Sequence, residues 1–113
     1  GGNPLACAAV SKVFDLFEEQ QIVKHVQDIA PYLEQKLDEL VDQYDCLSLR
    51  RGQGLMQGVV VTGRPVGEIV KKALEQKLII LSAGSDVLRF VPPLVIEKED
   101  VDEMICRLER ALA

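Results

Sequence analysis

The chain has 113 residues and a formal net charge of −5, with 48% hydrophobic, 27% charged and 4% aromatic residues. This length and composition are typical of one soluble globular domain with a core of its own. A nucleic-acid partner is disfavoured, because phosphate binding needs a basic surface and stacking aromatics, and here acidic residues outnumber basic ones. Because no apolar run reaches the length of a membrane span and no stretch resembles a signal peptide, we expect a cytoplasmic protein without a membrane partner.

Two helices are predicted in the first part of the chain. Asn3 is a good N-cap and Pro4 suits the first helical position, so a helix is expected from about Pro4. Apolar residues recur on one of its faces at Leu5, Ala9, Val13 and Phe17. A second helix is predicted over about 21–44, where apolar residues again have helical spacing. Pro31 should bend or split this second helix, since an interior proline removes a hydrogen bond and clashes with the preceding turn.

The pattern then becomes that of a β-hairpin. Two apolar runs lie on either side of Gly52 and Gly54, and they predict antiparallel strands at about 46–51 and 55–62 joined by a tight glycine turn. The segment RGQGLMQG is rich in glycine, but it does not open a helix after a strand. A hairpin is therefore favoured over a phosphate-binding loop.

The second half of the chain predicts a helix, a short hairpin and a last helix. The third amphipathic helix spans about 66–74, and two short strands flank a turn at 83–86. The C-terminal helix covers about 101–112, with acidic residues near its positive dipole end. The order ααββαββα predicts an α+β fold, in which a small antiparallel sheet of about four strands is covered by helices. We expect residues 1–113 to form a single domain.

Three groups of residues could suggest a reactive or metal site, and each is better explained structurally. They are the acidic group Glu97, Glu99, Asp100 and Asp102, the cysteines Cys7, Cys46 and Cys106, and the lone histidine His25. The acidic group lacks the ligand spacing and turn glycine of a calcium loop, so it is interpreted as a solvated helix start. The cysteines show no CxxC pair and are expected to be reduced, mostly buried thiols. The histidine has no second histidine to complete a zinc site and is expected to be structural or solvated, so no metal is expected.

The segment VLRFVPPLVI, residues 87–96, places Arg89 inside an apolar run that two prolines end. In one interpretation the stem of Arg89 covers the edge of the sheet while its guanidinium group reaches water. In the other, the guanidinium lies at the mouth of a pocket and binds a carboxylate in a bidentate fork. The residue pattern alone leaves both interpretations open.

Three segments, GGNPLACAA, RGQGLMQG and AGSDVLRFVPPLVI, in this order and spacing, resemble the C-terminal part of class III pyridoxal-phosphate-dependent aminotransferases. The resemblance covers residues 1–113 and is strongest to the acetylornithine and succinylornithine branch. It implies the small C-terminal domain of a fold-type I enzyme, a fragment whose cofactor domain precedes it, and amino transfer from N-acetylornithine to 2-oxoglutarate in arginine biosynthesis. Ornithine or 4-aminobutyrate aminotransferases, a stand-alone amino-acid-binding module and a structural or subunit-contact module are the alternatives.

The resemblance also implies roles for individual residues. Arg89 stands where the family binds the α-carboxylate of its amino-acid and 2-oxo-acid substrates. Gly1, Gly2 and Asn3 belong to a loop near the cofactor of the neighbouring subunit, although the family's phosphate-binding threonine is not in this sequence. The family's Schiff-base lysine lies upstream, so we expect no catalytic residue in this chain. Pyridoxal 5′-phosphate is expected in a full-length homodimer and not on this chain alone. Glu97 replaces a helix-capping threonine, which puts that cap in doubt.

Overall fold

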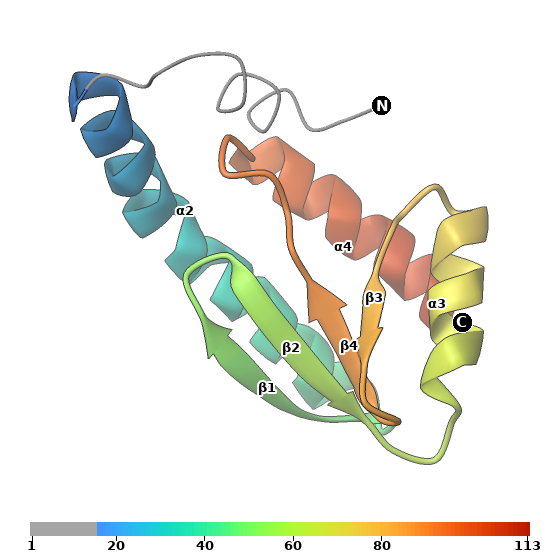
Figure 1. The fold of residues 1–113 in the computed structure, drawn as a ribbon. Coiled ribbons are helices and arrows are strands. Elements are labelled where there is room, and N and C mark those ends of the chain that lie inside the picture. The colour runs from blue at the N-terminus through green and yellow to red at the C-terminus, as the bar shows by residue number, and fades with distance from the viewer. Residues whose placement is uncertain (1–15) are drawn as a thin grey trace.

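The structure is a computed structural model, which describes residues 16–113 as an α+β arrangement of helices and one antiparallel sheet (Figure 1). Its elements in chain order are α2 (Leu16–Gln43), β1 (Leu47–Gln53), β2 (Met56–Val61), α3 (Val66–Glu75), β3 (Leu81–Ala83), β4 (Val87–Phe90) and α4 (Lys98–Leu112). The predicted fold class and the order ββαββα after the long helix are confirmed. The helix predicted from Pro4, its N-cap and the Gly1–Asn3 loop lie outside the described residues.

The sheet joins two hairpins into four strands in the order β1-β2-β4-β3. Strand β1 pairs with β2 and β3 pairs with β4, and the two hairpins meet where β2 pairs with β4. The turn at 83–86 is confirmed, with Gly84 at a φ of 66°. This order makes β4 an internal strand, although it is next to last among the elements of the chain.

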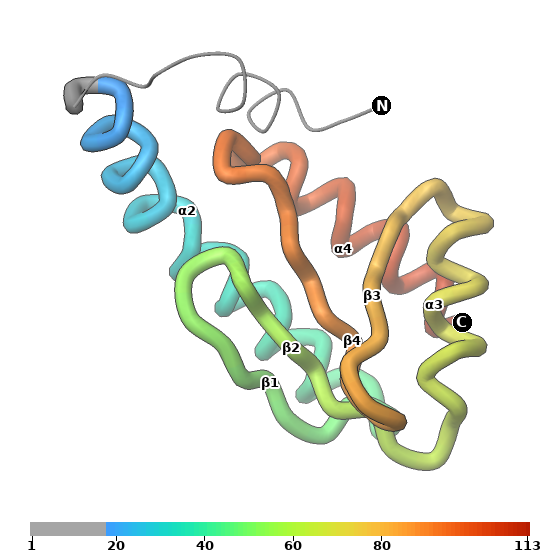
Figure 2. Tube along the Cα trace, in the orientation of Figure 1, coloured from blue at the N-terminus to red at the C-terminus, as the bar shows by residue number. Residues whose placement is uncertain are grey.

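The described helices cover one face of the sheet. In Figure 2 the chain of α2 passes behind β1 and β2, and α3 and α4 complete the layer beside it. Alternate strand residues point into the core between sheet and helices: Leu47, Val59, Val61, Leu88 and Phe90. Their partners from the helices are fully buried and include Leu33, Leu37, Ile69, Val101 and Leu108. The fold is therefore a two-layer structure whose second sheet face has no described helix over it.

Helix α2 differs from its prediction at its start, and it continues through Pro31. It begins at Leu16, not at about 21, and the polar run 18–21 lies inside it. Glu and Gln are good helix formers, and acidic side chains in the first turn favour the helix dipole, so this run extends the helix instead of breaking it. Pro31 does not split the helix. Burial of Ile29 and Leu33 on either side of Pro31 holds both halves on one core, and such packing overrides local preference.

Two arginines fasten the ends of α3 and α4. Arg64, just before α3, donates to the Leu112 carbonyl at the end of α4 at 2.8 Å and to the Glu68 carboxylate at 2.8 Å. The hydrogen bond between Arg64 and Glu68 lowers the pKa of Glu68 and raises the pKa of Arg64. Arg107 donates to the carbonyl of Lys77 at 2.9 Å, where the backbone leaves α3 with a φ of 63°. The helix pair is thus joined at both ends by guanidinium-to-carbonyl bonds.

The acidic residues at the start of α4 have structural partners. The Asp100 carboxylate accepts a hydrogen bond from the Glu97 backbone N–H at 3.0 Å, which satisfies one of the unpaired donors of the first turn. The hydroxyl of Tyr32 on α2 donates to the Asp102 carboxylate, and this bond raises the pKa of Tyr32. The group is therefore more than a solvated helix start, since it caps α4 and fastens it to α2.

The cysteine prediction is wrong for Cys106. This residue is exposed on the outer side of the amphipathic helix α4, whereas Cys46 is partly buried beside the core, and both are free thiols. Cys7 lies outside the described part of the chain.

Gly52 is the position where the hairpin most needs a glycine. Its φ is 151°, and a Cβ atom there would lie 2.3 Å from the Met56 carbonyl oxygen. We expect Gly52→Ala to lower the free energy of unfolding by about 3 kcal/mol, because steric overlap adds to backbone strain. Urea titration of the 113-residue chain, followed by circular dichroism, measures this change.

Substitutions at two other glycines separate the contribution of steric overlap from that of backbone strain. Gly63 has a φ of 77°, and no atom lies within 4 Å of the position that a Cβ atom would take there, so Gly63→Ala tests strain alone, at about 1 kcal/mol. Gly67 lies in α3 with open space around it, so Gly67→Ala should stabilise the chain by roughly 0.5–1 kcal/mol. If Gly52→Ala and Gly63→Ala lower the free energy of unfolding equally, the role assigned to steric overlap at Gly52 is contradicted.

Candidate substrate-binding face of the sheet

Arg89 lies in the middle of the sheet on its uncovered face. Its neighbours Leu88 and Phe90 are 0% and 2% exposed and point into the core, whereas Arg89 is exposed. Successive residues of a strand point to opposite faces, so two buried neighbours on one side require Arg89 to project from the other. Because β4 runs between β2 and β3, the interpretation of Arg89 as a residue at the sheet edge is wrong.

A row of directly paired residues crosses the sheet at this level. Arg51 of β1 pairs with Gly58 of β2, Gly58 pairs with Arg89, and Arg89 pairs with Leu81 of β3. Directly paired residues present their side chains on the same face. The two arginines therefore stand on the uncovered face, separated by one glycine. Two strand spacings place their Cα atoms roughly 10 Å apart.

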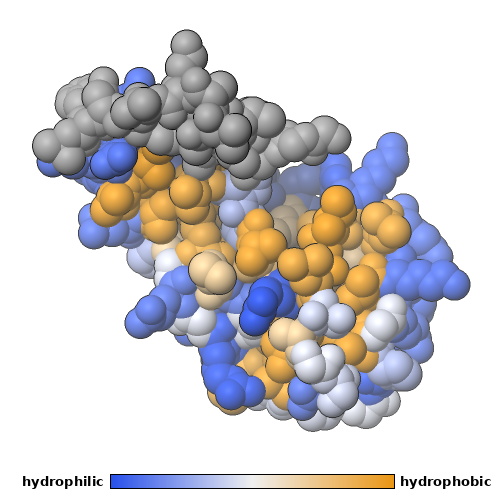
Figure 3. All heavy atoms as spheres, viewed as in Figure 1, coloured by the Kyte–Doolittle hydropathy of each residue, from blue (hydrophilic) through white to orange (hydrophobic). Residues whose placement is uncertain are grey.

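The surroundings of this row are apolar. Leu49, Met56 and Leu81 are 49%, 64% and 47% exposed, and Val60 and Val87 are partly buried on the same face. Figure 3 shows apolar side chains gathered over this side of the molecule, with a strongly hydrophilic one among them. A contiguous exposed apolar surface of this kind marks an interaction site. The geometry suits a ligand or covering segment that has both apolar parts and a negative charge.

The opposite side of the β1–β2 hairpin is held by a polar network. Arg50 donates to the Asp38 carboxylate of α2 at 2.6 Å and to the Gln57 side-chain oxygen at 2.8 Å. The Gln57 amide donates to the Gly54 carbonyl in the turn at 2.7 Å, and Gln57 is only 1% exposed. The adjacent residues Arg50 and Arg51 thus lie on opposite faces of the hairpin and have different roles. Arg50 fastens the hairpin to α2, and Arg51 projects from the uncovered face.

The glycine-rich segment is a hairpin, as predicted. Gln53 pairs with Met56, which leaves a two-residue turn of Gly54 and Leu55. Gly54 has a φ of 58°, a conformation that suits glycine at the first position of such a turn. Gly52, the other predicted turn residue, lies within β1.

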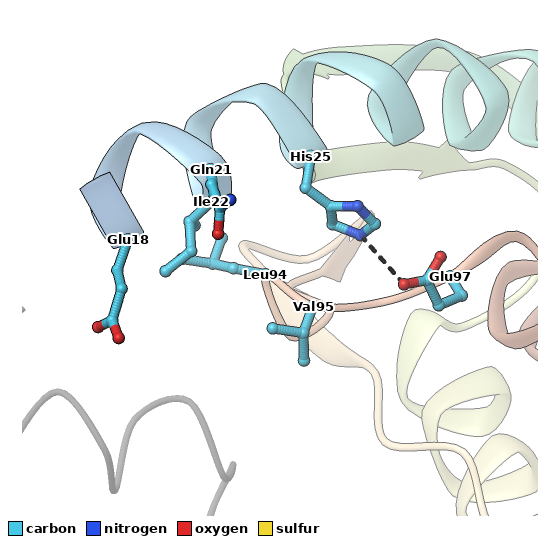
Figure 4. Close-up of a pocket in the computed structure, with 7 residues that line it drawn as sticks. All are labelled: Glu18, Gln21, Ile22, His25, Leu94, Val95 and Glu97. Atoms are coloured by element: carbon cyan, nitrogen blue, oxygen red, sulfur yellow. Dashed lines mark ion pairs between the residues drawn. The ribbon is translucent and has the colours of Figure 1, made fainter. Parts of the chain in front are cut away.

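A groove lies near the N-terminal end of α2. It has a volume of about 410 Å³ and is lined by Glu18, Gln21, Ile22, His25, Leu94, Val95 and Glu97 (Figure 4). His25 Nε2 lies 2.6 Å from the Ile96 carbonyl oxygen and 3.9 Å from Glu97 Oε1, so it joins α2 to the segment after β4. This geometry fits the structural interpretation of His25. Two carboxylates in the lining disfavour an anionic ligand here.

The described lysines lie on the surface of the domain. All of them are exposed or only partly buried: Lys24, Lys36, Lys71, Lys72, Lys77 and Lys98. A lysine that forms a Schiff base is activated by desolvation or a cationic neighbour in a pocket. Lys24 and Lys98 line two open pockets of about 330 and 290 Å³, but both side chains are exposed there. Residues 16–113 likewise contain no cluster of three metal-ligating side chains and no helix long and apolar enough to cross a bilayer. Lys12 lies outside the described residues.

The sequence matches the family model of the Aminotransferase class-III family over residues 1–112. The chain belongs to this family. Along its whole length this class III chain is 43% identical to the acetylornithine aminotransferase of Gloeobacter violaceus and 39% identical to acetylornithine aminotransferase 1 of Bradyrhizobium diazoefficiens. It spans 28% of the length of each of these relatives.

Solved aminotransferase structures have the same fold in part of their chains. The N-acetylornithine aminotransferase of Stenotrophomonas maltophilia superimposes with a TM-score of 0.73 at 37% identity, over 80% of this chain and 26% of that one. The lysine aminotransferase of M. tuberculosis gives a TM-score of 0.77 at 27% identity, over 86% of this chain and 23% of that one. The two-layer α+β structure is thus part of a fold-type I aminotransferase, as the sequence resemblance implied.

The family resemblance points to Arg89 but not to Arg51 and Gly58, its neighbours in the row. Arg51 and Gly58 lie in the segment that was interpreted only as a hairpin. A register for the two hairpins would have placed them beside Arg89, but that register depends on pairing between β2 and β4, which are distant in sequence.

We predict that Gln57→Leu destabilises the chain by about 2–3 kcal/mol. The substitution leaves the Gly54 carbonyl without its side-chain donor and removes one acceptor from Arg50, and an unsatisfied buried group loses the full energy of its solvation. Gln53→Leu, an exposed change on the same hairpin, should stay within about 0.5 kcal/mol of the parent. Chemical denaturation gives the free energy of unfolding of both variants. If Gln57→Leu and Gln53→Leu lower it by similar amounts, the stabilising role of the polar network is refuted.

Proposed function

We propose that this chain is the C-terminal, substrate-orienting domain of a pyridoxal-phosphate-dependent aminotransferase, in which Arg89 binds the α-carboxylate of both substrates. One observation carries the proposal: in a chain of this family, the guanidinium of Arg89 projects from the centre of an uncovered apolar sheet face. A planar guanidinium donates two parallel N–H bonds to a carboxylate, which both binds it and sets its orientation.

The neighbours of Arg89 support this role physically. Leu81 pairs with Arg89 on one side, and Val87 and Met56 lie on the same face. Once a substrate and the rest of the enzyme cover this face, these side chains exclude water and lower the local dielectric constant, so that the ion pair strengthens. A carboxylate held in two bonds also directs the substrate's reactive carbon, and orientation of this kind lowers the barrier of the reaction that follows.

For the reaction we propose amino transfer from N-acetylornithine to 2-oxoglutarate in arginine biosynthesis. The support is the names of the relatives, since chains 43% and 39% identical to this one are acetylornithine aminotransferases. The lysine aminotransferase of M. tuberculosis, at 27% identity, shows that a similar domain serves another donor, and ornithine or 4-aminobutyrate enzymes are the alternatives. Family membership favours these enzymes over a stand-alone amino-acid-binding module.

The described residues bind and orient and do not supply the reactive amine. In the whole enzyme, bound pyridoxal phosphate supplies the electron sink for amino transfer. No described lysine lies in a suitable pocket, so we assign the cofactor to other parts of the enzyme. Contact of Gly1, Gly2 and Asn3 with the cofactor, the homodimer and the cytoplasmic location stay predictions.

The test of Arg89 uses the full-length enzyme. Arg89→Lys keeps the charge but loses the planar fork, and Arg89→Ala loses both, at an expected cost of about 2–5 kcal/mol in substrate binding. Both half-reactions should weaken, because donor and acceptor each carry the α-carboxylate, while the spectrum of the bound cofactor stays unchanged. Single-turnover kinetics of each half-reaction measure the apparent affinities.

Arg110→Ala is the matched control for charge, since Arg110 is exposed on the last turn of α4, away from the sheet. It should leave both half-reactions unchanged. If Arg89→Ala binds both substrates as the parent does, Arg89 is only a surface residue of the sheet and the proposed function loses its central observation.

A second prediction concerns the 113-residue chain alone. We expect no transaminase activity and no stoichiometric absorbance change on mixing with pyridoxal phosphate, because the described lysines lie in open, solvated positions. Borohydride reduction followed by peptide mass spectrometry should find only sparse labelling spread over several lysines. Stoichiometric labelling of a single lysine would contradict this assignment.

A further inference from the structure

We propose that Gln57 is a positioning residue for Arg89, which fixes the direction of the Arg89 guanidinium through the backbone and so strengthens recognition of the α-carboxylate. This inference rests on the proposed function of Arg89 and assigns to it a support on the opposite face of the sheet. Three features carry it: the place of Gln57 beside Arg89, the hydrogen bonds of its side chain, and the glycines of the surrounding segment.

The first feature is the place of Gln57 in the sheet. Gln57 of β2 pairs with Phe90 of β4, and the next pair along the two strands is Gly58 with Arg89. Gly58 has no side chain, so it offers the backbone of Arg89 no side-chain packing of its own. The position of Arg89 is therefore set by the neighbouring pairs. Gln57 and Phe90 form the neighbouring pair toward the hairpin turn, and they are only 1% and 2% exposed.

The second feature is that the buried Gln57 side chain is bonded on several sides. Its amide oxygen accepts a hydrogen bond from Arg50 at 2.8 Å, and its amide nitrogen donates to the Gly54 carbonyl at 2.7 Å and to Glu34 of α2 at 3.4 Å. Arg50 is in turn paired with Asp38 of α2 at 2.6 Å. A buried polar network whose members are satisfied imposes one geometry, because each of its bonds is directional. Gln57 thus joins the start of β2 to the helix beneath the sheet.

The third feature is the glycine content of the stretch 52–58. Glycine stands at 52, 54 and 58, and it allows more backbone conformations than any other residue. A segment of this kind keeps one geometry only where side chains fasten it, and Gln57 supplies buried hydrogen bonds there. Loss of these bonds should widen the range of directions that the Arg89 guanidinium adopts, without removing its charge. A misplacement of about 1 Å in a site can lower a rate by up to about 100-fold.

The experiment compares two amino donors in the full-length enzyme. N-acetylornithine carries the α-carboxylate, and N-acetyl-1,4-diaminobutane is the same molecule without it. Single-turnover kinetics of the donor half-reaction give the carboxylate preference, defined as the ratio of the second-order rate constants for the two donors. We expect Gln57→Leu to lower this ratio by roughly 5- to 30-fold, through slower reaction of N-acetylornithine alone. Arg50→Lys keeps a positive charge beside Asp38 but loses the fork that holds both Asp38 and Gln57, so it should lower the ratio by a smaller factor.

A matched control separates positioning from loss of stability. Leu108→Ala removes a buried side chain of α4, which packs on α2 and α3, and it should destabilise the domain about as much as Gln57→Leu while leaving the ratio unchanged. If Leu108→Ala lowers the ratio as far, general loosening is the cause and the inference is overturned. The inference is also overturned if the Gln57 and Arg50 variants slow both donors equally, or neither. If Gln57→Leu does not fold, Arg50→Lys alone decides.

Arg89→Ala distinguishes failure of this inference from failure of the proposed function. This variant should abolish most of the carboxylate preference. If the preference survives in Arg89→Ala, the proposed function fails. If Arg89→Ala abolishes the preference but the Gln57 and Arg50 variants keep it, Arg89 binds the carboxylate without support from Gln57, and only the inference about Gln57 is overturned.

Discussion

Burial of a single face of the sheet is the constraint on which the other features depend. Helices cover one side, so alternate residues of each strand must enter the core and the others must leave it. For β4 this places Leu88 and Phe90 inside, where each contributes about 1.5–3 kcal/mol of apolar burial, and Arg89 outside. A slip of one residue would expose both apolar side chains and bury an unpaired charge. Both effects favour the same register, which is why Arg89 has a well-defined place.

Because of the same constraint, the two faces of the β1–β2 hairpin have different roles. Its inner side carries the buried Gln57 and the ion pair of Arg50 with Asp38, which join the hairpin to the long helix α2. Its outer side carries Arg51 and Gly58, which pair across the strands. The backbone at Arg51 is held in place by the hydrogen bonds that its neighbour Arg50 makes to Asp38 and Gln57 on the inner side. The open face is therefore supported by hydrogen bonds on its inner side, and support of this kind is what a site needs if it is to orient a carboxylate.

Local patterns were sufficient to predict α3, α4 and both hairpins, because their apolar periodicity and turn glycines are local signals. They failed at the start of α2, where the polar run 18–21 resembles a break but continues the helix. Local alternation also does not assign Arg51 to the face on which it lies. Strict alternation places Arg51 on the same face as Leu47, but an irregularity between Leu47 and Leu49 shifts the register, so that Leu47 is buried and Arg51 is not. The central place of β4 follows from pairing with β2, which local patterns do not contain. The role of Arg89 came from family resemblance and not from the pattern.

On the proposed function, the uncovered face predicts that substrate affinity belongs to the assembled enzyme and not to this domain alone. In water, an exposed pair of arginine and carboxylate is worth only about 0–1 kcal/mol, because both charges are well solvated and salt screens them. The same fork gains strength only when the surrounding apolar side chains, such as Met56 and Leu81, are covered and water is excluded. Those side chains are about half exposed or more in this chain, so under this proposal the described domain supplies Arg89 and one apolar wall. The energy of carboxylate recognition then arises from closure of that wall against the opposite side of the site.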